Sequence, residues 1–109
     1  MRIRLALALS IAAALTTSAQ AQAPALQFER AAYVTCREAH AMTPEARRGL
    51  AMFLAEYSAR RYGVTIPEDT RGAQLAYLVR GGCTLYPEAY LYSVVDKAVL
   101  AERANLPKR

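Results

Sequence analysis

The chain has little of what most catalytic and metal-binding proteins use. Its 109 residues include no tryptophan, two phenylalanines, two cysteines and one histidine. Cys36 and Cys83 are too far apart for a Cys-x-x-Cys redox pair and too few for a zinc site. His40 has no Cys, Ser or acidic partner in a recognisable catalytic arrangement. We therefore expect no metal, no cofactor and no enzymatic activity, and His40 is either an incidental surface group or a pH sensor.

Concentrated positive charge is also missing, although the chain is basic. It carries 14 Lys+Arg against 9 Asp+Glu, and the bases occur mostly singly or in pairs such as Arg47-Arg48. Nucleic-acid-binding surfaces instead gather basic residues in a stripe with aromatic residues among them. We predict solvated helix faces and no nucleic-acid partner, with a polyanion binder as a weaker alternative.

Residues 1–21 have the pattern of an export signal. Arg2 and Arg4 precede an apolar run over residues 5–15, and residues 19–21 form an A-x-A cleavage site. The run is shorter than the roughly 20 residues that span a bilayer. We expect cleavage after Ala21, export to the periplasm and no stable membrane insertion. An uncleaved anchor is the alternative.

Export places Cys36 and Cys83 in an oxidising compartment, which favours one structural disulfide between them. The bridge would close a loop of about 47 residues, and chain-entropy arguments assign such a loop roughly 4 kcal/mol. That value is comparable to the whole net stability of a small domain. The stretch between the two cysteines is therefore predicted to organise the fold.

Capping residues and an Ala-rich, Gly-poor composition predict an all-α fold over residues 35–104. Thr35 and Glu38 form a capping box that begins a short helix, which ends near residues 40–42. Thr43 and Pro44 begin the longest helix, and Gly63 ends it.

Two further helices follow. Asp69 or Thr70 caps the next one, and Gly81-Gly82 either end it or permit a close approach at the disulfide. Pro87 is predicted to occupy the first position of the last helix, with Glu88 beside it. Residues 22–34 are expected to form an extended arm pinned by Phe28, Tyr33 or Val34, and residues 105–109 a frayed basic tail.

Apolar side chains repeat on one face of the longest helix and cover about 160° of the last helix. The wide stripe is either a surface for a partner or the face of a central helix that is contacted on several sides. The candidate client or dimer surface comprises Leu50, Phe53, Leu54, Leu91, Tyr92, Val94, Val95 and Val99.

Three motifs resemble those of the HdeA/HdeB family of periplasmic acid-stress chaperones, and are closer to the HdeB side. They are Thr35-Cys36 at the start of a short helix, Ala41-Met42-Thr43-Pro44 before the long helix, and Cys83 followed by Pro87 and Leu91-Tyr92. The resemblance covers residues 34–99. It implies a small four-helix orthogonal bundle with one disulfide, a homodimer at neutral pH, and an ATP-independent holdase that binds unfolding periplasmic proteins in acid.

Acid would act on the nine carboxylates, all of which follow the predicted signal. Glu45 and Glu88 are the candidate acid triggers because both are predicted to lie at helix starts, where a negative charge is favoured. Protonation would remove that stabilisation and leave the basic chain self-repelling. The alternative function is a binding or structural module without a pH gate, which holds a fixed envelope partner through the same apolar surface.

Overall fold

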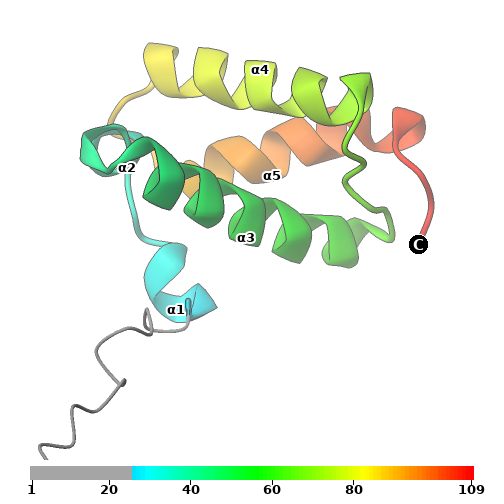
Figure 1. The fold of residues 1–109 in the computed structure, drawn as a ribbon, viewed down its shortest axis with the longest axis horizontal. Coiled ribbons are helices and arrows are strands. Elements are labelled where there is room, and N and C mark those ends of the chain that lie inside the picture. Colours follow the sequence, from blue (N-terminus) through cyan, green and yellow to red (C-terminus); the bar gives the residue numbers. More distant parts are fainter. Residues whose placement is uncertain (1–25) are drawn as a thin grey trace, which may run out of the picture.

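The structure is a computed structural model that describes residues 26–109. The predicted export signal and its cleavage site after Ala21 lie outside the described residues. The described residues form an all-α fold with one disulfide, which confirms the predicted fold class. The helices are α1 (Phe28–Ala31), α2 (Cys36–Ala41), α3 (Pro44–Tyr62), α4 (Thr70–Leu85), α5 (Leu91–Glu102) and the 3₁₀ helix η2 (Arg103–Asn105) (Figure 1).

Local capping chemistry explains the bounds of α2 and α3. Thr35 Oγ1 accepts a hydrogen bond from Glu38 N at 3.1 Å, and Glu38 Oε1 accepts one from Thr35 N at 2.9 Å. Thr43 caps α3 through its hydroxyl, and Pro44 occupies the first turn. Gly63 ends α3 with a φ of 71°, a conformation that costs least for glycine. These bounds agree with the prediction.

Helix α4 continues past the two glycines, which were expected either to end it or to permit a close approach at the disulfide. Asp69 caps its first turn as predicted, but the helix runs through Gly81 and Gly82 to Leu85. A Cβ atom at Gly82 would lie 2.6 Å from Val94 Cγ1. The glycine therefore permits a close approach, but it is the approach of α4 to α5.

Helix α5 begins later than its proline suggested. Pro87 precedes the helix, which starts at Leu91. Cys36 N donates to Ala89 O and Leu91 N donates to Val34 O, each at 2.8 Å. Because these bonds hold the segment before α5 beside the chain that enters α2, that segment cannot continue the helix. Tertiary pairing overrides the local signal here.

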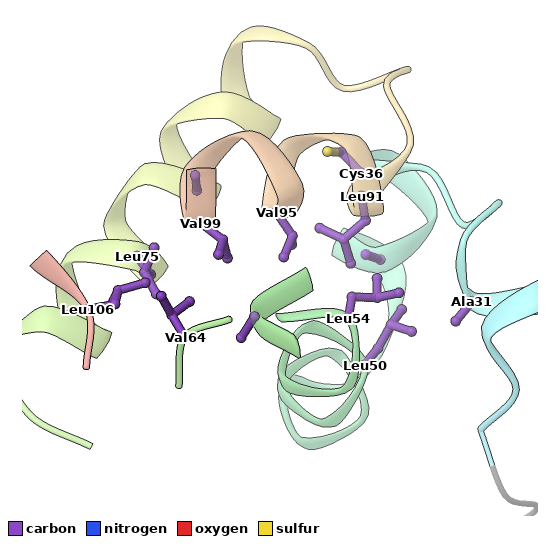
Figure 2. Close-up of a cluster of buried hydrophobic side chains, with 13 residues drawn as sticks. Ala31, Cys36, Leu50, Leu54, Val64, Leu75, Leu91, Val95, Val99 and Leu106 are labelled. Carbon is purple, nitrogen blue, oxygen red and sulfur yellow. The ribbon is translucent and has the colours of Figure 1, made fainter. Parts of the chain in front are cut away.

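Helix α5 lies between α3 and α4 and contacts both (Figure 1). Its apolar stripe meets the inner faces of both neighbours in one core (Figure 2). The buried apolar residues are Ala31, Cys36, Ala39, Leu50, Leu54, Ala59, Val64, Leu75, Leu91, Val95, Ala98, Val99 and Leu106. The last helix is thus the centre of the fold.

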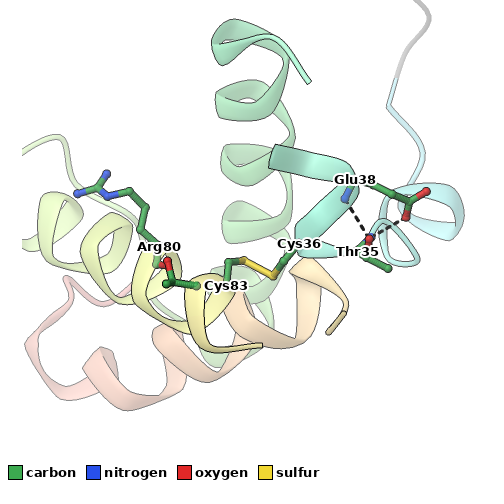
Figure 3. The surroundings of a disulfide bond; sticks show 6 residues. Thr35, Cys36, Glu38, Arg80 and Cys83 are labelled. Carbon is green, nitrogen blue, oxygen red and sulfur yellow. Dashed lines mark hydrogen bonds between the residues drawn. A yellow bond between two sulfur atoms is a disulfide. The ribbon is translucent and has the colours of Figure 1, made fainter. Parts of the chain in front are cut away.

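The predicted disulfide between Cys36 and Cys83 is confirmed. It joins the first residue of α2 to the last turn of α4 across a sequence separation of 47 residues, with the two Cα atoms 5.3 Å apart (Figure 3). The closed loop contains α3 and most of α2 and α4, whereas α5 follows it. Helix α5 is therefore attached to the stapled part by noncovalent contacts and by the chain connection, with no covalent cross-link of its own among the described residues.

The arm before α2 is not wholly extended, because α1 forms within it. Phe28 stacks on Tyr57 of α3, Tyr33 meets the edge of Tyr90, and Val34 accepts the backbone bond from Leu91. All three residues that were expected to pin the arm contact the body.

The C-terminal tail is held and not frayed, which corrects the prediction. Leu106 is buried in the core. Lys108 forms an isolated antiparallel bridge with Val64, and Arg109 N donates to Gly63 O at 2.9 Å. One buried leucine and these backbone bonds close the tail against the end of α3.

Candidate functional site

The eight side chains predicted as a client or dimer surface belong to α3 and α5, and we call this set the α3/α5 seam, although Val94 of α5 faces Gly82 of α4. Five of them are buried in the core: Leu50, Leu54, Leu91, Val95 and Val99. Three are partly buried and pack against it: Phe53, Tyr92 and Val94. Most of the seam is therefore closed to a partner in this folded state. The structure supports the reading in which the stripe belongs to a central helix.

One carboxylate crosses the seam. Asp96 of α5 accepts a hydrogen bond from Ser58 Oγ at 2.8 Å and another from the Tyr62 hydroxyl at 2.9 Å. Arg61 Nη1 lies 3.7 Å from Asp96 Oδ1. Ser58 is 0% exposed and the Asp96 side chain 18%. A charged acceptor thus links α3 to α5 beside apolar packing, and we call these four residues the Asp96 cluster.

The cluster sets the charge states of its neighbours. The hydrogen bond to Asp96 raises the pKa of Tyr62, and burial raises the pKa of Tyr92. A hydrogen bond to Tyr92, with help from Tyr62 and Asp96, raises the pKa of Arg61. At neutral pH both phenols are therefore neutral and the guanidinium is charged.

The Asp96 cluster was missed at the sequence level. Asp96 directly follows Val95 of the apolar stripe, and a carboxylate at that place was the available signal. Its partner Ser58 carries no signal of its own, since a lone serine in a helix is common. The pairing becomes visible only when α3 and α5 are packed.

The two predicted acid triggers lie elsewhere. Glu45 is exposed in the first turn of α3, as expected. Glu88 precedes α5 and forms an ion pair with Arg37 at the start of α2, so its expected place in a helix start is wrong. Both partners are mostly exposed, and such pairs stabilise little.

Two other carboxylates have a depressed pKa because they cap helices. Backbone and side-chain hydrogen bonds to Thr35 lower the pKa of Glu38. The side chain and backbone of Arg71 lower the pKa of Asp69. Each pKa is lower in the folded chain, so the stability it gives is present above the unfolded pKa. That stability is lost as the pH falls through the folded value.

An open groove runs between the second half of α4 and α5, with a volume of about 720 Å³. Leu85 and Tyr86, 73% and 66% exposed, stand at one end, and Val94 lines it from α5. Glu88 and Lys97 supply its charged side chains. Leu85 was missed because α4 was expected to stop at the glycines; once the helix continues, Leu78, Gly82 and Leu85 share one face.

A third feature is aromatic. Tyr57 of α3 and Tyr92 of α5 have ring centroids 6.0 Å apart, and Phe28 of α1 sits against both. We call Tyr57 and Tyr92 the aromatic seat. Beside it lies a shallow depression of about 330 Å³, lined by Tyr57, Arg60 and Arg61.

His40 is exposed at the end of α2, and its backbone carbonyl accepts a hydrogen bond from Arg47 Nη1 at 3.1 Å. Among residues 26–109, no group of three or more His, Cys, Asp or Glu is placed to hold a metal ion. None of the helices in this part of the chain has the length and apolar character needed to cross a membrane.

Comparison of the chain with protein-family models, curated proteins and solved structures gave no match.

Proposed function

We propose that this protein is an ATP-independent periplasmic holdase, which binds unfolding proteins under acid stress. The observation that carries the proposal is the α3/α5 seam: a continuous apolar contact between two helices, fastened by the carboxylate of Asp96. The sequence motifs of the chain resemble those of the HdeA/HdeB chaperones, and the Cys36–Cys83 disulfide fits an oxidising compartment.

Acid would weaken the fold in two ways. Protonation of Glu38 and Asp69, whose pKa values are lowered in the folded chain by their capping hydrogen bonds, removes stability from the starts of α2 and α4. It also raises the positive charge of the whole chain. Cleavage of the predicted signal would remove Arg2 and Arg4 and leave 12 Lys and Arg side chains against 9 Asp and Glu side chains. The net charge from these residues would go from +3 to +12 when every carboxylate is neutral. The resulting self-repulsion favours an expanded state.

The disulfide determines which part opens. Acid does not break it, so α2 and α4 stay connected through Cys36 and Cys83. Helix α5 follows the closed loop and can leave α3 without breaking a covalent bond. The apolar residues of both helices then face solvent on a chain of limited extension, and this is the surface that would hold a client.

Aggregation of an unrelated acid-labile client tests the proposal. Light scattering would be followed at pH 7 and at pH 2–3, with the protein oxidised and with it reduced. We expect suppression in acid by the oxidised protein and none at pH 7. Equal suppression at both pH values would refute the acid gate, and no suppression at either would refute the holdase.

The second candidate function is a binding module without a pH gate. The α4/α5 groove favours it, because Leu85 and Tyr86 are exposed in the folded chain. The groove would hold a fixed envelope partner while the seam stays closed. Replacing Leu85 by Ser separates the two: it abolishes binding at pH 7 for this module, whereas it leaves acid-induced client protection intact for the holdase.

A further inference from the structure

The N-terminal arm occupies the aromatic seat as a ligand would. The Phe28 ring stacks on Tyr57 with centroids 3.7 Å apart and an interplanar angle of 9°, and it meets Tyr92 edge-on at 5.0 Å. The edge contact with Tyr92 is one of the preferred geometries of aromatic pairs. The seat thus recognises a phenyl ring with one residue from α3 and one from α5.

The arm is held loosely apart from that ring. Helix α1 has four residues, and its N-cap Gln27 makes no side-chain cap bond. Among the described residues, the backbone N–H groups of the arm donate only to carbonyl groups within the arm, at residues 27–31. Its first backbone hydrogen bond to the body is the one that Val34 O accepts from Leu91 N. The ties of the arm before Val34 are the Phe28 ring, the buried Ala31 and the edge contact between Tyr33 and Tyr90. A helical turn this short has little stability of its own, so its first residues with the Phe28 ring can leave the seat while Tyr33 and Val34 stay attached.

The depression beside the seat indicates which ligand fits. It is lined by Tyr57, Arg60 and Arg61. Arg61 lies beside Asp96, whereas no carboxylate among the described residues pairs with Arg60. An aromatic side chain with a neighbouring carboxylate would satisfy both the ring and the free guanidinium. In the arm Glu29 follows Phe28, but among the described residues it forms no ion pair with Arg60 or Arg61, so the charge of Arg60 stays available to another ligand.

We propose that the aromatic seat is a binding site for an aromatic side chain of another polypeptide, preferably next to an acidic residue, and that the arm covers this site in the unbound chain. The site is accessible at neutral pH whenever the arm departs, without opening of the seam. Its role as a client site rests on the proposed holdase function, but the binding itself does not.

A labelled peptide that copies residues 26–34 tests the inference at pH 7. The wild-type chain, whose own arm competes, is compared with the Phe28→Ser variant by fluorescence anisotropy. We expect binding at least about tenfold tighter in Phe28→Ser, because a tethered competitor acts at a high effective concentration. Adding Tyr57→Ala to that variant should abolish binding. Tyr77→Ala, which removes a tyrosine that is 65% exposed on α4, is the matched control and should leave it unchanged.

The peptide's own chemistry provides a second comparison. Replacing its glutamate by glutamine should weaken binding and reduce the salt dependence, and replacing its phenylalanine by serine should abolish binding. Equal affinity for wild type and Phe28→Ser, or for Phe28→Ser with and without Tyr57→Ala, would overturn the inference.

A fluorescent variant covers the case in which Phe28→Ser fails to fold. The chain has no tryptophan, so Phe28→Trp provides a single reporter on the seat. Excess unlabelled peptide should shift its emission to the red as the indole leaves the tyrosines; emission that does not change at saturating peptide refutes displacement. These measurements need neither acid nor an aggregating client, so the inference and the holdase proposal fail independently.

Discussion

Replacing Asp96 by Ala is the substitution that tests the fastening of α3 to α5. It removes the acceptor of two hydrogen bonds and leaves Ser58, 0% exposed, with a buried hydroxyl that has lost its partner. Hydrogen bonds to charged groups contribute roughly 1.5–3 kcal/mol each, and an unsatisfied buried group costs about 1–3 kcal/mol. Because the Asp96 side chain is 18% exposed, we take the low end of the value for each of the two hydrogen bonds and add no separate penalty for the unsatisfied hydroxyl. The expected loss is about 3 kcal/mol in the free energy of unfolding.

Urea unfolding at pH 7 with the disulfide intact measures this loss. A double-mutant cycle with Ser58→Ala isolates the pair, and the single change at Ser58 should cost about 1.5 kcal/mol. The coupling between the two sites should reach about 1 kcal/mol, since both changes remove the same bond. Glu102→Ala is the matched control: this carboxylate is also on α5 but bonds only Asn105 among the described residues, and its loss should cost under about 0.5 kcal/mol.

Two results would refute this reasoning. One is a stability of Asp96→Ala within about 0.5 kcal/mol of the wild type, which is the range of ordinary surface changes. The other is strict additivity of the changes at Asp96 and Ser58. Either would mean that the cluster does not fasten the helices.

Three further predictions concern the staple, the glycines and the capping carboxylate. Replacing both Cys36 and Cys83 by Ser should cost about 4 kcal/mol and lower the Tm by roughly 20 °C in calorimetry; a shift under about 5 °C would contradict the loop argument. Gly82→Ala should destabilise by about 1–2 kcal/mol through its clash with α5, whereas Gly81→Ala, which meets open space, should stabilise by about 1 kcal/mol; chemical denaturation reads both, and equal effects would refute the close approach. Glu38→Gln should lose less stability than the wild type as the pH falls from roughly 4.5 through the lowered pKa of Glu38, because glutamine caps the helix without titrating. Urea midpoints between pH 5 and pH 2 measure this difference, and parallel pH profiles of the two proteins would exclude the effect.

The bounds of α2 and α3 and the disulfide could be predicted from the sequence. Helices α2 and α3 begin and end where Thr35, Thr43 and Gly63 indicated, because a cap needs only residues within one turn of it. The disulfide also followed, since two cysteines allow only one pairing. Neither conclusion required knowledge of how the helices pack against one another.

The errors arose where distant segments decide the local structure. Pro87 suggested a helix start, but backbone bonds to the chain entering α2 hold it outside α5. Gly82 suggested a helix end, but it lies against Val94 and serves packing instead. The tail was expected to fray, although Leu106 is buried in the core. Neither an apolar stripe nor a glycine states which element will lie against it.

The same limit explains why most residues of the predicted client or dimer surface are buried in the core. The stripe on α5 was identified correctly as apolar, but its period does not tell whether it faces a partner or another helix of the chain. The role of Asp96 was not predicted because its partners on α3 are more than thirty residues away in the sequence. Only the packed helices reveal that one carboxylate bonds across the seam.

The central claim is that the seam closes when the acids are charged and opens to clients when they are neutral. A photo-reactive leucine analogue placed at Leu54 tests it directly, because this side chain lies at the centre of the seam and is fully buried. We expect cross-links to an acid-unfolded client at pH 2–3 and none at pH 7. Cross-links of equal yield at both pH values, or no cross-link in acid while the client is protected from aggregation, would contradict it.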